Sequence, residues 1–519
     1  MSASSRDRDE TTLPGHGERD TTFDELRHDW RRRAPWLAIS AAAHLLMFFL
    51  LMALPWDELA DEEEKTFTAS LQPPPAEVFE ERAEVIEEVE EVSAEEEPQL
   101  RDAEISEHDE EDAHEELEAI DDDPSFLSSP PFDSEVFNDV IGLGVGARGK
   151  YGARFGGKED LRVASGAAAQ QALKDALEWL KAHQSQDGSW DCDGFARNCG
   201  KIGASTCKGP GGPTHDVGVT ALALLAFLGD GNTTSQGRYK GVVSRGIAWL
   251  KEQQDPDSGL LGERRSHDFI YDHAIGALAL CEAYYFSRSP LIKGTAQKAI
   301  NFIFQARNPY GAWRYDQPPV GDSDTSVTGW MVFALTSAKD AGLQGDFAGA
   351  FGGALSFLDD VTDPVTGRVG YSAFGELSSR TPDNEHFPRE RGEAMTAVGL
   401  LCRIFLAQRP EEFPVMHRHA ELLRAKPPVW DPDGFGSDMY YWYYGTYALF
   451  QMGRPHWPVW EKAMKAAVVE SQAQEGDERG SWDPTVCAWG FAGGRVYSTA
   501  LMTLCIEVYY RYGQVLGAR

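Results

Sequence analysis

Three aspartates stand at one equivalent position, at the start of three consecutive apolar helical segments. They are Asp216, Asp272 and Asp324, each followed by a run of mostly apolar residues. If these helices are neighbours, burial and mutual repulsion would raise the pKa of one carboxyl group, which would keep a proton to donate near neutral pH. An aspartate before an apolar helical run is also a preferred N-cap. Proton donation and helix capping are therefore alternatives for each aspartate.

Polar and aromatic side chains occupy the same position, or one beside it, in other segments of this kind. They are His215, Asp216, Asp272, His273, Thr325, Glu393, Tyr443, Tyr444 and Tyr497, with Trp330 and Trp442 nearby. Aromatic faces attract cations, so the tryptophans and tyrosines could line a ligand cavity. His273 beside Asp272 could hold a metal ion or take part in a hydrogen-bond network. We expect the network, with no metal ion and no cofactor.

These segments belong to a repeat that fills the chain beyond residue 165. One unit is an amphipathic helix, a Gln, a Gly-x-Trp-like turn, and a second, more apolar helix. The first helices with their turns occupy residues 176–190, 246–262, 299–313, 354–370, 419–436 and 462–482. The second helices are apolar on nearly all faces, as buried helices are, whereas the first helices keep a charged face. The sequence predicts an all-α fold over residues 165–519, an (α/α)6 toroid of six helical hairpins with the apolar helices inside.

The Gln and Gly-x-Trp turns resemble the repeats of squalene-hopene and oxidosqualene cyclases, within the prenyltransferase and squalene-cyclase superfamily of α/α toroids. The resemblance implies that the Gln and Trp of each turn join neighbouring repeats. The stretch GDSDTSVTGW resembles part of the D-x-D-D-T-A motif of the hopene cyclases, in which the middle acid protonates an alkene. Asp322 and Asp324 match the first two acids, and Thr325 stands where the third would be. The resemblance implies that Asp324 is a general acid. Those cyclases use two helical domains, whereas this chain has one toroid.

A membrane anchor is predicted at residues 34–56, which carry no formally charged side chain between Arg33 and Asp57. About 20 apolar residues match the thickness of a bilayer. Basic residues precede the segment and acidic residues follow it, so residues 1–33 should form a cytoplasmic tail, with everything after Trp56 on the periplasmic side of the inner membrane.

Ser40 and His44 lie four residues apart and share one face of the predicted anchor helix. This S-x-x-x-H pattern, with a basic tail before it and a Pro- and Glu-rich segment after it, resembles the N-terminus of TonB-type energy transducers. The resemblance implies coupling to a proton-driven motor of the ExbB/ExbD kind. Packing of small residues in a helix dimer, with His44 hydrogen-bonded inside it, is the alternative.

An acidic linker is predicted over residues 57–135, which hold 32 acidic and 3 basic side chains. The formal net charge of the whole chain is −35, so this segment carries most of it. Such a segment cannot bury enough apolar surface to order itself. A Gly-rich hinge should follow at residues 136–164. The acidity argues against a nucleic-acid partner.

Seven cysteines fall into two groups. Cys281, Cys402 and Cys505 share one position in the apolar helices and should be buried thiols. The other four lie in loops and are candidates for disulfides: Cys192, Cys199, Cys207 and Cys487. Cys192 and Cys487 each follow a Gly-Ser-Trp-Asp turn in the first and last repeats, which ring closure would make neighbours. Disulfides are expected in a periplasmic domain, with zinc as the alternative.

Two functions remain from these patterns. The first is a non-catalytic toroid on a membrane anchor that binds a partner or an apolar or peptide ligand and is coupled to a motor. The second is an enzyme similar to the terpenoid cyclases, in which Asp324 protonates an isoprenoid.

Overall fold

The computed structural model describes Leu45 and residues 165–309, 311–433 and 435–512. All of these except Leu45 belong to one compact unit. The predicted tail, acidic linker and Gly-rich hinge lie outside the described residues, as does the predicted anchor apart from Leu45. Within the described ranges, no helix combines the length and the apolar character needed to cross a membrane.

The described residues form helices joined by loops and contain no β-strand, as the all-α prediction required. The inner helices are α5 (Asp216–Gly229), α7 (Phe269–Ser287), α9 (Thr325–Asp340), α11 (Ala394–Phe405), α13 (Met439–Met452) and α15 (Gly490–Ile506). The outer helices are α4 (Ala167–Ala182), α6 (Lys240–Glu252), α8 (Pro290–Ala306), α10 (Phe347–Val361), α12 (Val415–Ala425) and α14 (Trp457–Val469). A short helix, α16 (Val508–Arg511), follows α15.

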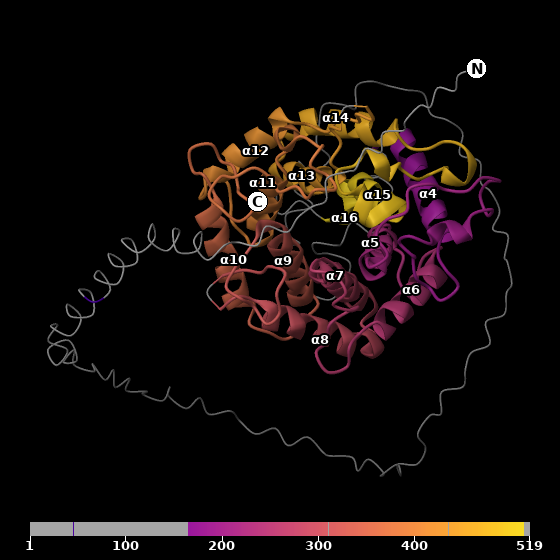
Figure 1. Ribbon diagram of the computed structural model, residues 1–519, viewed down its shortest axis with the longest axis horizontal. Coiled ribbons are helices and arrows are strands. Elements are labelled where there is room, and N and C mark those ends of the chain that lie inside the picture. Colours follow the sequence, from indigo (N-terminus) through magenta and orange to yellow (C-terminus); the bar gives the residue numbers. More distant parts are fainter. Residues whose placement is uncertain (1–44, 46–164, 310, 434, 513–519) are drawn as a thin grey trace, which may run out of the picture. The chain divides into compact units, whose positions relative to one another are not determined.

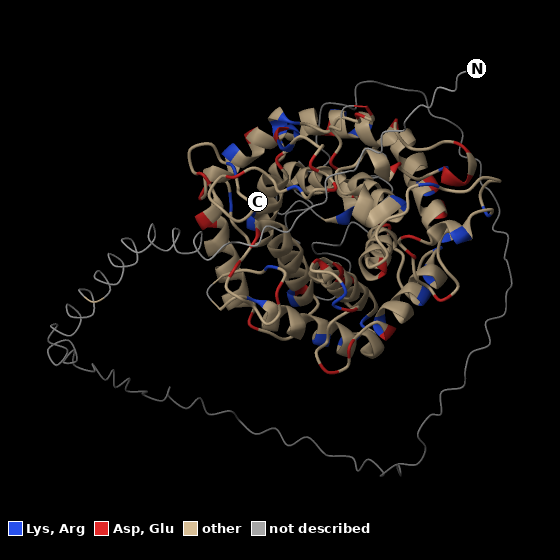
Figure 2. Ribbon diagram, in the orientation of Figure 1, with Lys and Arg blue, Asp and Glu red and all other residues tan. Residues whose placement is uncertain are grey.

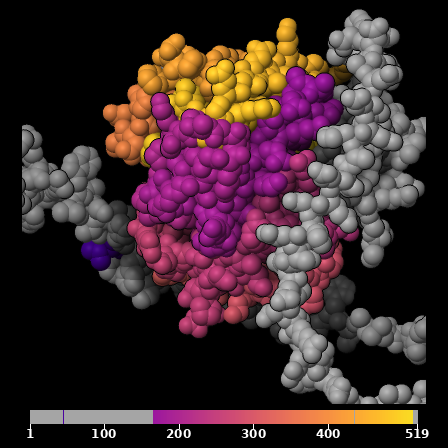
Figure 3. All heavy atoms as spheres, turned by 90° about the vertical axis from the view of Figure 1, so that its right-hand side faces the viewer, coloured from indigo at the N-terminus to yellow at the C-terminus, as the bar shows by residue number. Residues whose placement is uncertain are grey.

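The inner helices form a closed ring (Figure 1). Each packs against the next, and α15 packs against α5. The outer helix α4 also packs against α15 and α14, so the first and last repeats share a seam. Figure 3 shows this seam, where the first repeat (purple) lies against the last (yellow). The six predicted helical hairpins are therefore present, with the apolar helix of each pair inside.

The division into inner and outer helices follows from their composition. Every residue of α5 after Asp216 is buried. In α6, the corresponding outer helix, the buried residues form one stripe: Val242, Val243, Gly246, Ile247 and Leu250. Lys, Arg, Asp and Glu positions lie mostly on the outer helices and the loops, whereas the inner helices contain few of them (Figure 2). A helix that is apolar all round has to be surrounded, and the ring of amphipathic helices surrounds it.

In three of the turns a Gln joins neighbouring repeats by hydrogen bonds, namely Gln184, Gln254 and Gln472. Gln184 Nε2 donates to Gly188 O at 2.9 Å in its own turn and to Val242 O of α6 at 3.0 Å. At the seam, Gln472 Nε2 donates to Gly480 O at 3.0 Å and to Ala172 O of α4 at 2.7 Å. The turn Trp is buried and anchors its own helix, as in Trp190 Nε1 donating to Leu180 O at 2.7 Å. The joining role that the resemblance implied is thus seen for these three Gln residues, whereas the hydrogen bond of Trp190 stays within its own repeat.

The turn glycine is required by its backbone. Gly188 has φ +100°, and a Cβ at this residue would collide with the backbone oxygen of Arg245 in α6. Only glycine combines a left-handed conformation with so close an approach of the next outer helix. The Gly-x-Trp pattern is therefore a requirement of repeat packing and by itself indicates no activity.

A buried charge cluster lies at the C-terminal end of the inner helices. Arg511 of α16 is fully buried and contacts Glu282 Oε2 of α7 at 3.1 Å and Glu507 Oε2 at 3.2 Å. It also donates to Leu225 O of α5 at 2.6 Å. The last helix thus connects three inner helices, which the repeat pattern did not predict.

Candidate functional site

Asp324 is both a helix cap and a buried acid. It is fully buried before α9, and its Oδ1 accepts a hydrogen bond from Val327 N at 2.8 Å. Its Oδ2 accepts no hydrogen bond of ordinary geometry within the described residues, and Arg314 Nε lies 3.9 Å away. Burial raises the pKa of Asp324 to about 7, against the opposing effects of the Val327 amide and Arg314. The two alternatives drawn from the sequence therefore hold together at this residue.

Asp322, the other matched acid, lies on the surface. Its side chain is 70% exposed and pairs with Arg314 Nη1 at 3.1 Å. Since Arg314 also approaches Asp324, Asp322 can influence the buried acid only through this arginine. The structure does not bring the two carboxyl groups into one site.

Four tyrosines surround the Asp324 region. The hydroxyl groups of Tyr315 and Tyr371 hydrogen-bond to each other, and Tyr271 lies edge-on to Tyr315 with 6.0 Å between the ring centroids. Tyr440 of α13 hydrogen-bonds Ser326 Oγ at 2.9 Å. Burial, followed by the charge of Asp324, raises the pKa of Tyr315 and Tyr371. These phenols therefore stay protonated and able to donate hydrogen bonds beside the acid.

The sequence analysis missed these tyrosines, although a signal was present. Tyr315 follows the turn glycine Gly311 by four residues, and Tyr371 follows Gly367 by the same number. The shared register predicts neighbouring positions in consecutive repeats. Tyr271 and Tyr440 belong to inner helices two repeats or more apart in the chain, and only the closed ring brings them to this cluster.

A second polar group lies at the same ends of the inner helices. His215 Nδ1 contacts Asp272 Oδ2 at 3.1 Å, and its Nε2 lies 3.5 Å from Asp268 Oδ2. Burial raises the pKa of Asp272 to about 6, with His215 opposing it. Burial disfavours the charged form of His215, but the hydrogen bond and charge of Asp272 outweigh this effect and raise its pKa. The pair can hold a proton near neutral pH, as general acids and bases do.

Asp216 and Asp272 are not helix caps. Asp216 is the first residue of α5, and its Oδ1 accepts a hydrogen bond from Cys192 N at 2.8 Å, which fixes the first turn to α5. Asp272 lies inside the first turn of α7. Of the three aligned aspartates, only Asp324 caps its helix. The N-termini of the three helices are offset, because the loops that precede them differ in length.

Other predicted rim residues hold the repeats together. His273 is fully buried, accepts from Leu261 N at 3.0 Å through Nδ1 and contacts Ala299 O at 3.1 Å through Nε2. Burial lowers its pKa to about 3, and with both ring nitrogens used it is a member of a hydrogen-bond network. Thr325 Oγ1 donates to Gly370 O at 2.7 Å. Glu393 pairs with Arg368 at 2.9 Å and Lys426 at 2.8 Å.

Aromatic side chains fill the axis of the ring where a cavity was expected. Trp330 stacks on Tyr443 with 5.7 Å between centroids and an interplanar angle of 13°, and Tyr444 packs on both rings. Trp442 is buried as well. The hydroxyl groups of Tyr443, Tyr444 and Tyr497 are buried without a hydrogen-bond partner in the described residues. Side chains packed against one another take the space between α9 and α13, so the prediction of aromatic residues holds but they do not line an open cavity there.

Two grooves in the described residues lie away from the axis. One, of about 500 Å³, is lined by residues of α14 and by Val429 and Trp430, and the other, of about 310 Å³, lies between α4 and the start of α6.

Loops from three repeats meet over the N-terminal ends of α13 and α15. Asn384 Nδ2 donates to Ala488 O at 2.7 Å, and Arg380 Nη2 contacts Asp438 Oδ2, the cap of α13, at 3.2 Å. Phe435, in one of these loops, is 42% exposed, and Phe491, in the first turn of α15, is 43% exposed. Phe435 packs on Phe387, and Phe491 packs on Trp489. We call these four aromatic residues the rim patch. No motif in the sequence indicated it.

The cysteines follow the predicted grouping but not the predicted bonding. Cys281, Cys402 and Cys505 are buried in inner helices. Cys192 Sγ lies 3.4 Å from Ala492 O, so the expected contact between the first and last repeats exists. Cys487 instead accepts from Met439 N at 3.5 Å. All seven cysteines lie in the described residues and none forms a disulfide, because Cys192 and Cys487 have separate partners and Cys199 and Cys207 both face His183.

Residues 157–349 match the family model of the squalene-hopene cyclase C-terminal domain. Over 184 residues the chain is 27% identical to the squalene-hopene cyclase of Bradyrhizobium diazoefficiens, covering 33% of this chain and 26% of that protein. It is 25% identical over 187 residues to a probable squalene-hopene cyclase of Sinorhizobium fredii, covering 33% of this chain and 27% of that protein. The chain thus spans about a quarter of the length of these relatives. The resemblance of the toroid repeats to this family is confirmed, and that of the anchor to TonB-type transducers is not shown.

Solved structures with similar architecture include enzymes of several kinds. The unsaturated glucuronyl hydrolase of Bacillus sp. GL1 aligns with a TM-score of 0.47 at 14% identity, covering 66% of this chain and 96% of that one. An α-1,6-mannanase of Salegentibacter sp. HEL1_6 aligns with a TM-score of 0.45 at 13% identity, covering 66% of this chain and 98% of that one. A type II terpene cyclase from Scytonema in complex with geranylgeranyl dihydroxybenzoate aligns with a TM-score of 0.41 at 12% identity, covering 66% of this chain and 97% of that one.

Proposed function

We propose that this protein presents a squalene-cyclase-like toroid that binds an apolar or peptide ligand through the rim patch. The observation that carries the proposal is the distribution of aromatic side chains. On the axis they are buried against one another, whereas at the rim Phe435 and Phe491 remain more than 40% exposed. Large apolar side chains that share one exposed face mark interaction sites in soluble domains. The structure therefore supports binding at the rim more than binding inside the ring.

A buried ion pair supports the rim patch. The guanidinium group of Arg380 lies 5.9 Å from the Trp489 ring centroid and is held by Asp438 at 3.2 Å, with both of these charged side chains buried. Arg380 therefore helps to fix Trp489 in place and is not itself open to a ligand. A rigid aromatic anchor costs little conformational entropy on binding.

Photo-crosslinking tests this proposal without knowledge of the ligand. A photoreactive phenylalanine analogue in place of Phe491, in the full chain in its native cells, should give crosslinked species on irradiation. The same analogue in place of Val365, which is 81% exposed on another loop, is the matched control. Crosslinks at position 491 and none at 365 would support the rim patch, whereas equal labelling or none would refute it.

The anchor and its location belong to the same proposal. Residues 34–56 would hold the toroid at the inner membrane, with the N-terminus in the cytoplasm and the toroid in the periplasm. Ser40 and His44 would contact a proton-channel motor of the ExbB/ExbD kind. His44→Ala should then leave membrane insertion unchanged and weaken co-purification of the motor. Unchanged partners in the variant would assign the two residues to helix packing.

Proton transfer to an isoprenoid is the second candidate function, and Asp324 favours it. A buried carboxyl group with a raised pKa and tyrosines around it is suited to donating a proton. Incubation of the purified chain with linear isoprenoids, followed by analysis of the extract for cyclic products, tests this candidate. Product from the parent and none from Asp324→Asn would make the protein an enzyme, and no product from either would leave Asp324 a buried cap.

A further inference from the structure

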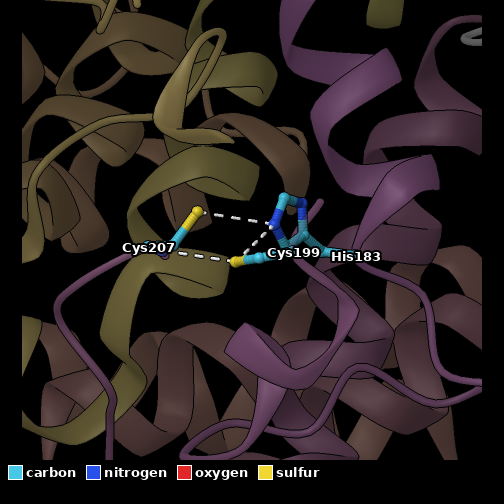
Figure 4. A group of neighbouring side chains, drawn as sticks. All are labelled: His183, Cys199 and Cys207. Atoms are coloured by element: carbon cyan, nitrogen blue, oxygen red, sulfur yellow. Dashed lines mark hydrogen bonds between the residues drawn. The ribbon is translucent and has the colours of Figure 1, made fainter. Parts of the chain in front are cut away.

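Three potential metal ligands converge at the seam between the first and last repeats, outside the rim (Figure 4). His183 follows the last residue of α4, Cys199 follows the short helix η4 (Phe195–Asn198), and Cys207 lies in the same insertion. His183 Nε2 lies 3.6 Å from Cys199 Sγ and 3.4 Å from Cys207 Sγ. The three ligand atoms all lie within 4.8 Å of one another. None of them takes part in the proposed rim function.

The hydrogen bond at the other ring nitrogen sets the tautomer of His183. Its Nδ1 lies 2.8 Å from Trp179 O, and a carbonyl oxygen can only accept, so Nδ1 carries the proton. The lone pair of Nε2 therefore faces the two sulfur atoms. A histidine that binds a metal commonly donates its second N–H to a backbone carbonyl in this way.

The distances leave room for one tetrahedral ion. With zinc bonds of about 2.3 Å to sulfur and about 2.0 Å to nitrogen, tetrahedral angles place sulfur and nitrogen about 3.5 Å apart. The two observed distances between Nε2 and sulfur fall on either side of this value. The imidazole is held in place by stacking on Trp179 at 4.1 Å between centroids. Little rearrangement would be needed to bind an ion.

A backbone amide group supports the Cys199 sulfur, the Cys207 sulfur donates to Asp477 O at 3.1 Å, and further amide groups hold the loop between them. Cys207 N donates to Cys199 Sγ at 3.2 Å, a contact that stabilises negative charge on that sulfur. Between the two cysteines the chain wraps around Asp477 of the last repeat, whose carboxylate accepts from the amides of Gly200 at 2.9 Å and Ser205 at 2.9 Å. Asp477 therefore positions the loop and has its oxygens occupied.

We propose that His183, Cys199 and Cys207 bind one zinc ion through Nε2 and the two sulfur atoms, and that the ion fastens the first repeat to the last. A nitrogen and two thiolates suit zinc among the abundant metals. On binding, both thiols release their protons to solvent and form bonds to zinc, with no change of oxidation state. The described residues supply no fourth side chain, so water takes the remaining position on the half-exposed side of Cys199.

A disulfide between Cys199 and Cys207 is the competing use of the same sulfur atoms. It would take both thiol contacts away from the Nε2 lone pair of the buried His183, and an unpaired buried polar atom is costly. A metal uses all three groups at once. For this reason the geometry favours the ion.

Metal analysis of the purified full-length chain tests the site. After dialysis against zinc and then against zinc-free buffer, mass spectrometry of the metal content should find one zinc ion per chain. Cys207→Ser should lower the zinc affinity by more than the about 10- to 100-fold typical of losing an outer partner of a metal ligand. Cys192→Ser, in the same insertion but outside the cluster, should keep its zinc.

Measurements on the parent chain keep the test independent of any folding defect in a variant. Removal of zinc by a chelator should speed the alkylation of Cys199 and Cys207 and lower the melting temperature, and zinc should reverse both effects. Cobalt added to the metal-free chain should give a thiolate-to-metal absorption band. A chain that binds neither zinc nor cobalt, or that carries a Cys199–Cys207 disulfide when purified, would overturn the proposal.

Discussion

Asp324→Asn should change the stability of the toroid in a pH-dependent way. Burial raises the pKa of Asp324 to about 7, whereas an aspartate in an unfolded chain titrates near about 3.9. The folded state therefore binds this proton more tightly than the unfolded state does. The stabilisation is complete below about pH 4 and is lost progressively as the pH rises through the folded pKa near 7.

The size of the effect follows from the difference in pKa. About three pKa units correspond to about 4 kcal/mol in total, of which about 2.5 kcal/mol is lost between pH 5 and pH 7.5. Asparagine cannot ionise and caps a helix about as well as aspartate, so the variant escapes this loss. For a toroid of about 350 residues, an unfolding entropy of about 2.1 cal/mol/K per residue converts 2.5 kcal/mol into about 3 to 4 °C.

Thermal melts followed by circular dichroism at the two pH values give the required comparison. The melting temperature of the parent minus that of Asp324→Asn should fall by about 3 to 4 °C from pH 5 to pH 7.5. Asp346→Asn is the control, because Asp346 caps the outer helix α10 with a side chain that is 66% exposed. A difference for Asp324→Asn that does not change with pH would refute the raised pKa and, with it, the argument for proton donation.

Three further perturbations test the architecture and the rim. Arg511→Met should destabilise the toroid by about 3 to 5 kcal/mol in chemical denaturation, because it removes the buried ion pair between Arg511 and Glu282. Gln472→Ala removes two hydrogen bonds at the seam and should cost about 1 to 3 kcal/mol, also measured by denaturation. Asp272→Asn should lower the pKa of His215, so that modification by diethyl pyrocarbonate extends to lower pH.

Each of these changes has a control within the chain. Arg479→Met removes an exposed ion pair with Asp175 and should cost under about 1 kcal/mol. Gln474→Ala affects a single hydrogen bond within its own loop. Asp268→Asn should shift the titration of His215 less than Asp272→Asn does, since Asp268 is the more distant partner. Equal effects in a variant and its control would contradict the structural assignments.

Asp324 shows how far sequence reasoning reached at the rim. Its type, its place before an apolar helix and the match to a cyclase motif all indicated a capping residue or an acid. The structure adds that Asp324 is completely buried. Burial raises its pKa, so the residue that caps α9 can also hold a proton near neutral pH. His273 directly follows the aligned Asp272, yet its ring lies between two repeats, where it hydrogen-bonds the backbone at Leu261 and Ala299. The aligned residues fall at different places relative to the starts of their helices. Alignment in the sequence therefore does not determine which way a side chain points.

The sequence alone determined the repeat, the inner and outer roles of the helices and the turn chemistry, because these depend on local periodicity and on contacts between adjacent units. It could not determine what fills the axis, since Trp330 and Tyr443 come from helices 113 residues apart and meet only when the ring closes. The same holds for the rim patch, whose residues come from separate repeats. His183, Cys199 and Cys207 lie within one segment, but Asp477 of the last repeat holds the loop between the two cysteines in place. Long-range packing, which no local pattern encodes, decided these sites.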